Sequence, residues 1–142
     1  MIFMATEIST MDDLQAIQGD LSGDYVLTDD LDALDYDWTP IGDQFEGPFT
    51  GTFDGNGHTI DGLSLDNGTD GPAALFGLAY GCTIKNVRLH NVWFQGAYAA
   101  GLIATGQPDL VGNIEVTGRI EGEYGAGGII ARVEEPSGGG EA

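Results

Sequence analysis

A repeat with a period of about 27 residues constrains the fold of this chain more than any other feature. The segments "ALFG" (74–77), "GLIA" (101–104) and "GIIA" (128–131) share a small–apolar–apolar–small pattern, and each begins one such interval after the one before. A second pattern keeps this interval, because Asn86-Val87 is followed by Asn113-Ile114. Two patterns with one period predict a solenoid in which consecutive turns of the chain lie on one another.

Within each turn, the apolar residues alternate as they do in a β-strand. In "TIKNVRL" (83–89), Ile84, Val87 and Leu89 can face inward while Lys85 and Arg88 face outward, with an irregular step at Asn86. We align this segment with the earlier "TIDGLSL" (59–65). The two segments are three positions closer than the repeat interval, and we place this difference in the loop between them. Glycine accounts for 24 of the 142 residues, which fits corners where a positive φ is needed.

Stacking of the turns is predicted to form one continuous apolar core, because a single turn is too small to bury its own apolar face. The predicted core residues are Ile60, Leu63, Leu65, Leu75, Phe76, Ile84, Val87, Leu89, Leu102, Ile103, Ile114, Val116, Ile120, Ile129 and Ile130. Cys82, the single cysteine, is predicted to be a small buried residue rather than a nucleophile.

The first residues carry the signals of a short helix. Ser9 or Thr10 can cap it, Asp12 and Asp13 lie in its first turn, and Gly19 ends it. The sequence predicts three parts: an N-terminal cap (1–51) with a helix over 10–18, a first strand and a packed loop; solenoid turns (52–133); and a flexible glycine-rich tail (134–142).

The charge of the chain is strongly negative. Asp and Glu number 23 against 4 Lys and Arg, for a net charge of −19. Such a chain repels nucleic acid and anionic lipid. Spread acidity with almost no lysine suits concentrated salt, so we expect a halophilic source, with an acidic mesophilic surface protein as the alternative. No apolar run is long enough to span a membrane, and the first ten residues do not resemble a signal peptide.

The segment "GTFDGNGHTIDGLSL" (51–65) is the best candidate for a functional loop, but its residues favour a turn. Asp-Gly and Asn-Gly are strong turn signals, and neither the helix of a dinucleotide fingerprint nor the Gly-Lys-Ser/Thr of a P-loop follows. His58 and His90 are therefore predicted to be turn or surface residues, in preference to catalytic or metal-binding ones.

Carboxylates are frequent enough that chance clusters are expected. Asp29, Asp30, Asp32, Asp35 and Asp37 could gather a hard cation, and "DNGTDG" (66–71) resembles the start of a calcium loop but lacks its glutamate. Solvated acidic turns are the favoured interpretation. No catalytic, cofactor-binding or metal-ligating residue is assigned, and no cofactor is expected.

An outer polar stretch and several aromatic residues are the remaining candidates for binding. Lys85, Asn86, Arg88, His90 and Asn91 could form a polar shelf, although solubilising side chains are the favoured interpretation. Because Trp93 and Phe94 are adjacent, one of them must point out of the core of an extended strand. Together with Tyr98 and Tyr124 they could bind a sugar or a protein, or cover a loop.

From about residue 7 to 133 the chain resembles the GLUG-type repeat proteins of bacterial and archaeal surfaces. The resemblance rests on "WTPIGD", "FTGTFDGNGHTIDGLSL", "ALFG", "TIKNVRLHNV", "AGLIA" and "AGGIIA". The final glycine of the motif is kept at Gly77 and replaced at Ala104 and Ala131. The resemblance implies an all-β fold: a short right-handed parallel β-helix of about three to four turns with a short N-terminal capping helix. It implies no catalytic residues.

These features predict a non-catalytic structural or adhesion module, not an enzyme, on the surface of a cell or a virion in a salty habitat. The alternative is a fragment of a carbohydrate-active β-helix enzyme or a glycan-binding module, since glycoside hydrolysis needs only two suitably placed carboxylates. We expect a protein partner or a second copy at the open C-terminal turn, with a glycan as a further partner. We expect neither nucleic-acid binding nor membrane insertion.

Overall fold

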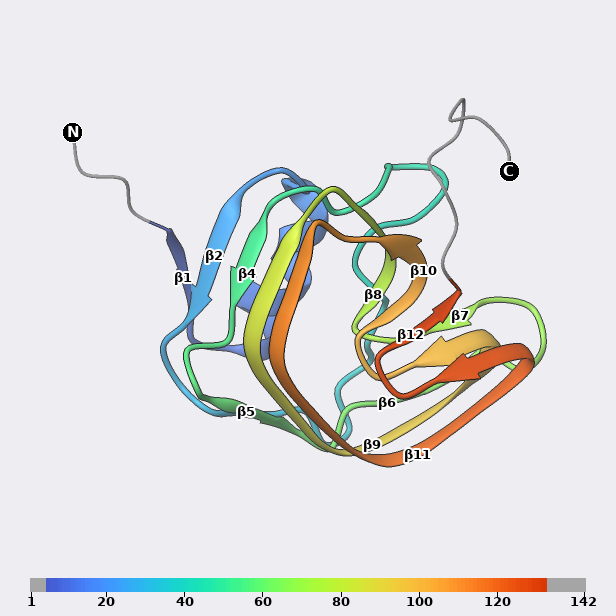
Figure 1. The fold of residues 1–142 in the computed structure, drawn as a ribbon. Helices are drawn as coiled ribbons and strands as arrows, with labels where there is room; N and C mark the ends of the chain where they lie inside the picture. The colour runs from blue at the N-terminus through green and yellow to red at the C-terminus, as the bar shows by residue number, and fades with distance from the viewer. Residues whose placement is uncertain (1–4, 133–142) are drawn as a thin grey trace.

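The chain forms a parallel β-solenoid of about four turns, seen in Figure 1 as ribbons that wind around a common interior. The structure is a computed structural model that describes residues 5–132. One short helix, α1 (Met11–Gln15), continues into a 3-10 helix (Ala16–Gly19). The strands are β1 (Thr6–Ile8), β2 (Asp24–Leu27), β3 (Leu31–Asp32), β4 (Thr52–Asp54), β5 (Thr59–Asp61), β6 (Ser64–Asp66), β7 (Pro72–Ala73), β8 (Phe76–Tyr80), β9 (Thr83–Ala100), β10 (Ile103–Gln107), β11 (Leu110–Gly127) and β12 (Ile130–Arg132). The predicted parallel β-solenoid is thus confirmed.

Two columns of parallel strands define the stack. In the first, β1, β2, β4, β9 and β11 lie side by side (Figure 1), so that Tyr25, Phe53, Ile84 and Val111 occupy equivalent positions on successive turns. In the second, β8, β10 and β12 pair in the register Phe76, Ile103 and Ile130. In the C-terminal half, residues that are one repeat interval apart in the sequence are therefore backbone partners on adjacent turns.

The long strand β9 organises the centre of the solenoid. It has 18 residues and bends around the interior, and the edge that faces the preceding turn pairs with four short strands, β4, β5, β6 and β7. Its other side pairs with β11, which is equally long. The bends fall at Asn86 and Asn91, whose φ angles are 57° and 58°. Asparagine tolerates this left-handed backbone better than most residues do.

The predicted alignment of residues 59–65 with 83–89 is wrong. Instead, β4 pairs with the start of β9, with Phe53 opposite Ile84, and β5 pairs farther along, with Ile60 opposite Leu89. The difference arises at one corner. The later turns pass it with a single left-handed asparagine, whereas the loop after β4 carries two extra residues around Asn56 and Gly57, both with positive φ.

The N-terminal segment forms a helix, and it also supplies strands. Thr10 caps α1 by accepting a hydrogen bond from the backbone N–H of Asp13, and Met11, Leu14 and Ile17 are buried. However, β1, β2 and β3 already pair with later turns. Parallel stacking therefore begins well before residue 52, inside the predicted cap, and residues 133–142, including the predicted tail, lie outside the described residues.

The core contains the predicted columns together with aromatic residues from the packed loop. Among the predicted residues, Leu65, Ile114, Val116, Ile120 and Ile130 are only partly buried, Ile129 is 37% exposed, and the rest are buried. The sequence did not assign Trp38, Phe49 and Phe53 to the core, but all three are fully buried. Trp38 donates its indole N–H to the backbone oxygen of Ala74 at 3.1 Å, which anchors the loop.

Close backbone approach between turns makes a glycine at position 106 necessary. A Cβ there would lie 1.9 Å from the backbone oxygen of Ala79 on the previous turn, whereas a Cβ on Gly112 would meet nothing within 4 Å. We predict that Gly106→Ala destabilises the protein by about 1–3 kcal/mol, and that Gly112→Ala changes stability by less than about 0.5 kcal/mol. Urea unfolding followed by circular dichroism measures both, and equal stabilities would contradict the stacking.

Candidate functional site

A polar hollow lies on the outer face of β3, β5 and β9. Its volume is about 470 Å³, and it is lined by Asp30, Leu31, Asp32, Thr59, Asp61, His90 and Asn91. Three of these side chains occupy equivalent positions on consecutive turns, because Asp32 pairs with Asp61 and Asp61 with His90. The register of the solenoid thus gathers on one face polar residues that lie far apart in the sequence.

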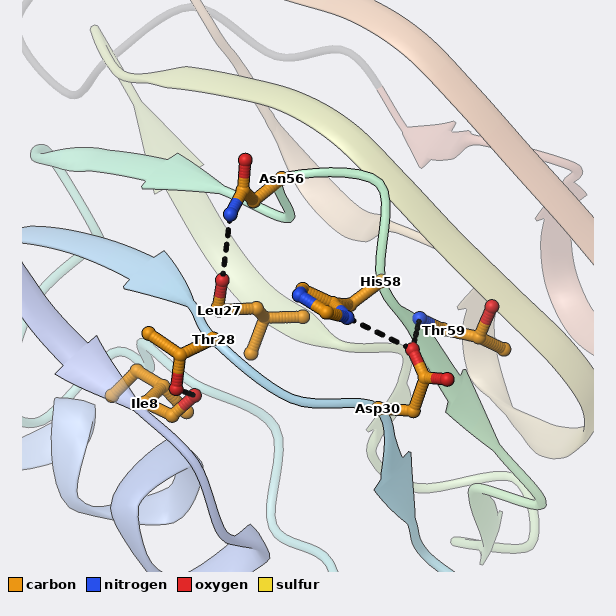
Figure 2. A network of polar contacts seen from close by, with 7 residues as sticks. All are labelled: Ile8, Leu27, Thr28, Asp30, Asn56, His58 and Thr59. Carbon is orange, nitrogen blue, oxygen red and sulfur yellow. Dashed lines mark hydrogen bonds and ion pairs between the residues drawn. The ribbon is translucent and has the colours of Figure 1, made fainter.

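Asp30 is the centre of the contacts at one rim of this hollow (Figure 2). Its Oδ1 accepts the backbone N–H of Thr59 at 3.0 Å and lies 3.0 Å from Nδ1 of His58. Both contacts favour the ionised carboxylate and lower the pKa of Asp30. The backbone hydrogen bond from Thr59 has the larger effect, and the contact with His58 has the next largest. His58 is therefore a corner residue that contacts the preceding turn, in line with the predicted surface role.

The neighbouring contacts in Figure 2 also join consecutive turns. Asn56 donates from Nδ2 to the backbone oxygen of Leu27 at 3.3 Å, and Thr28 donates from Oγ1 to the backbone oxygen of Ile8 at 3.4 Å. Asn56 has a φ of 55°, so the turn chemistry predicted for "DGNG" is present. These side chains supply donors to backbone groups, which suits a structural corner.

Three residues of the predicted polar shelf, Asn86, His90 and Asn91, have partners on adjacent turns. His90 contacts Glu115 through Nε2 and Oε2 at 2.5 Å, a partner that sequence reasoning did not find. Asn91 donates from Nδ2 to Oδ1 of Asp61 at 2.8 Å, and its backbone N–H donates to Oγ1 of Thr117 at 3.1 Å. The correct corner would have brought Asp61 and Asn91 together. His90 and Glu115 are 25 positions apart, so the repeat interval did not pair them.

The acidic segments are organised as turns. Asp32 accepts the backbone N–H of Leu34, Asp66 accepts that of Gly68, and Asp35 has a φ of 63°. Between residues 5 and 132, no group of three or more His, Cys, Asp and Glu side chains is arranged to hold a metal ion. Burial raises the pKa of the Cys82 thiol to about 11, which disfavours the thiolate that a nucleophile requires.

A second, more apolar groove lies beside the loop that carries Phe45. Its volume is about 410 Å³, and Phe45, Pro72, Leu78 and Tyr98 line it together with Asp43 and Asp70. Phe45 is 83% exposed at the tip of a tight turn in which Asp43 and Gly47 exchange backbone hydrogen bonds. The sequence did not single out Phe45, because an aromatic residue in a packed loop is normally buried.

The other predicted aromatic residues divide as the strand pattern requires. Phe94 is fully buried and Trp93 is only half-buried, which confirms that one of the pair points outward. Tyr98 and Tyr124 lie on adjacent turns with ring centroids 6.2 Å apart, and Tyr124 is 70% exposed. The exposed aromatic surface therefore extends from Phe45 and Tyr98 toward the last turn.

Three comparisons place this arrangement among known proteins. The family model of the M26 IgA1-specific metallo-endopeptidase N-terminal region matches residues 8–118. A halomucin of Haloquadratum walsbyi is 34% identical over 90% of the chain, which spans only 2% of the halomucin. A crystal structure from Bacteroides ovatus, assigned as an immunoglobulin A1 protease, superposes with a TM-score of 0.72 at 19% identity, covering 94% of this chain and 44% of that one. No helix within residues 5–132 has the length and apolar character needed to cross a membrane.

The lowered pKa of Asp30 predicts a pH-dependent contribution to stability. A carboxyl whose pKa is depressed by folding stabilises the folded state above its unfolded pKa of about 3.9, and this contribution is lost as the pH falls through the lower, folded value. Asp30→Asn should therefore have a lower Tm than Asp29→Asn at pH 7, and the difference should shrink as the pH falls below about 3.9. Asp29→Asn is the matched control because it removes the same charge from the same turn. A Tm difference that stays constant with pH would contradict this account.

Proposed function

Because this chain belongs to the family of M26 IgA1-specific metallo-endopeptidase N-terminal regions, we propose that it is a structural β-solenoid module of a longer, surface-associated protein and carries out no catalysis itself. The observation that carries the proposal is the use of its polar side chains. Asp30, Asn91 and His90 contact residues on adjacent turns. Side chains engaged in this way hold a scaffold together and are poorly placed to act on a substrate.

The names of the relatives support a location outside the cell, since one is a halomucin and the family model is that of an IgA1-specific protease. The family description names an IgA1-specific metallo-endopeptidase, and the match is to the N-terminal region of that protease. The other relative is named as a halomucin, and the chain corresponds to only 2% of its length. A segment of this kind serves as a spacer or presents other parts of a long protein. The GLUG assignment and an adhesive role remain parts of this proposal.

Labelling of intact cells tests the proposed location. Antibodies raised against residues 5–132 should label unpermeabilised cells of the source organism, and external protease should remove the epitope. A cytoplasmic enzyme of the same cells serves as the control for cell integrity. Labelling that appears only after permeabilisation would contradict the surface role, and hydrolysis of a peptide or glycan by the purified chain would contradict the structural one.

Glycan binding is a second candidate function, favoured by the groove beside Phe45. Aromatic faces pack on the apolar faces of sugars, and this groove combines Phe45 and Tyr98 with the carboxylates of Asp43 and Asp70. Phe45→Ala should then abolish binding to glycan arrays while leaving Tm unchanged, because the side chain is 83% exposed. Equal glycan binding by this variant and the parent would reject the groove.

Adaptation to concentrated salt is part of the proposal, since the net charge is −19 and one relative comes from Haloquadratum walsbyi. Salt shortens the Debye length from about 10 Å at 0.1 M to about 3 Å at 1 M, which weakens repulsion among the carboxylates. We predict that Tm rises between 0.1 M and 3 M KCl, as measured by differential scanning fluorimetry. A variant with Asp29, Asp35 and Asp37 all changed to Asn should show a smaller rise. A Tm independent of salt would contradict the prediction.

A further inference from the structure

The two ends of the solenoid differ in how their apolar residues are covered. At the N-terminal end Ile8, Met11 and Leu14 are at most 7% exposed, because α1 lies against β1. At the C-terminal end Leu110 is 55% exposed and Ile129 is 37% exposed, while Ile114, Val116 and Ile120 are only partly buried. Among residues 5–132, the apolar residues of the last turn are therefore less covered than those of the first turn.

The backbone of the last turn is open as well. Within residues 5–132, β11 pairs only with β9, and β12 pairs only with β10. The outer edge of β11 is 18 residues long, and such an unpaired edge is a template for another strand. Figure 1 shows β11 as the outermost ribbon of its column, with no strand beyond it.

A ladder of side-chain hydrogen bonds runs along the stack toward this edge, and each amide in it donates to the preceding turn. Asn86 donates from Nδ2 to Oδ1 of Asp54 on the previous turn at 3.0 Å, and Asn113 donates from Nδ2 to Oδ1 of Asn86 at 2.9 Å. An ionised carboxylate can only accept hydrogen bonds. Asp54 therefore fixes the amide of Asn86, whose oxygen must face Asn113, and this in turn fixes the amide of Asn113.

The ladder ends on a free acceptor. Asn113 is exposed, and among the described residues its Oδ1 has no hydrogen-bond donor. Its φ of 56° matches the 57° of Asn86, so the two corners have the same backbone conformation. A further turn would continue the ladder only if it ran parallel to β11 and presented a donor at this corner.

We infer that the open edge of β11 binds a further parallel solenoid turn that carries a left-handed asparagine opposite Asn113 and donates its amide to Asn113 Oδ1. This inference rests on the proposed structural role. We assign this turn to another part of the proposed longer protein, because residues 133–142 contain no asparagine and Gly140 occupies the position one repeat after Asn113. A second copy is disfavoured: pairing β11 with itself across a two-fold axis is antiparallel, and two chains of charge −19 repel each other.

An added turn tests the inference. A copy of residues 106–132 is fused directly after Arg132 in place of 133–142, which sets the copied asparagine one repeat after Asn113. Amide hydrogen exchange in β11 is compared with that of the full parent chain. We expect the β11 amides not bonded to β9 to exchange at least about tenfold more slowly, with unchanged exchange in β9 as the control for folding of the parent turns.

Two variants of the added turn separate the amide from the backbone. Changing the copied asparagine to Gly keeps the left-handed backbone available and removes the donor, so protection should fall. Changing the copied asparagine to Asp places a carboxylate next to Asn113 Oδ1, and two acceptors repel each other, so amide protection in β11 should fall further. At low pH the protonated acid can donate a hydrogen bond, so protection should be partly restored. Equal protection by all three added turns would overturn the role of the amide ladder.

Other occupants of the edge give distinguishable results. If deletion of residues 133–142 speeds exchange of β11 in the parent chain, those residues cover the edge and the inference is wrong. If sedimentation equilibrium in 3 M KCl shows a dimer that Asn113→Gly abolishes, a second copy is the occupant and the inference is again wrong. If the added turn does not slow amide exchange in β11 while antibodies still label intact cells, the inference about the docking turn is wrong and the proposed surface role still holds.

Discussion

Hydrogen bonding between backbone groups one turn apart is the interaction on which this structure depends. In a parallel stack each strand obtains its partners from the turns on either side, so no turn is stable alone. Positions that repeat every turn must then be alike. The inner positions are apolar, as in the column of Phe76, Ile103 and Ile130, and the corners take residues that accept a left-handed backbone, as Asn86 and Asn113 do.

The same requirement explains why polar side chains of the described residues contact one another across adjacent turns. Side chains at equivalent positions of adjacent turns lie close together, so polar residues there bond to one another, as in the pairs of Asp61 with Asn91 and His90 with Glu115. Their chemistry is used in joining turns. Among the described residues, the groove beside Phe45 and the outer edge of β11 are the surfaces that we propose for recognition.

The sequence predicted the fold well because the repeat interval directly reflects the stacking, and Leu75 and Leu102 are buried as expected. It misplaced residues 59–65 because a tight corner built on one asparagine and a longer loop at Asn56 and Gly57 have the same turn composition. Of the side-chain contacts, that of Asp61 with Asn91 depends on this register. His58 contacts Asp30 on a turn that the repeat did not include, and His90 contacts Glu115 at a separation of 25 positions, which differs from the repeat interval. The early strands β1 and β2 were missed as members of the stack because α1 and the loop after it interrupt the repeat.

Cross-strand nuclear Overhauser effects between backbone protons of the labelled chain test the central claim most directly. The stack predicts contacts between Ile84 and both of its partners, Phe53 and Val111, and between Phe76, Ile103 and Ile130 in the second column. Contacts that instead join Ile60 with Ile84, or antiparallel contacts between neighbouring segments, would contradict the account.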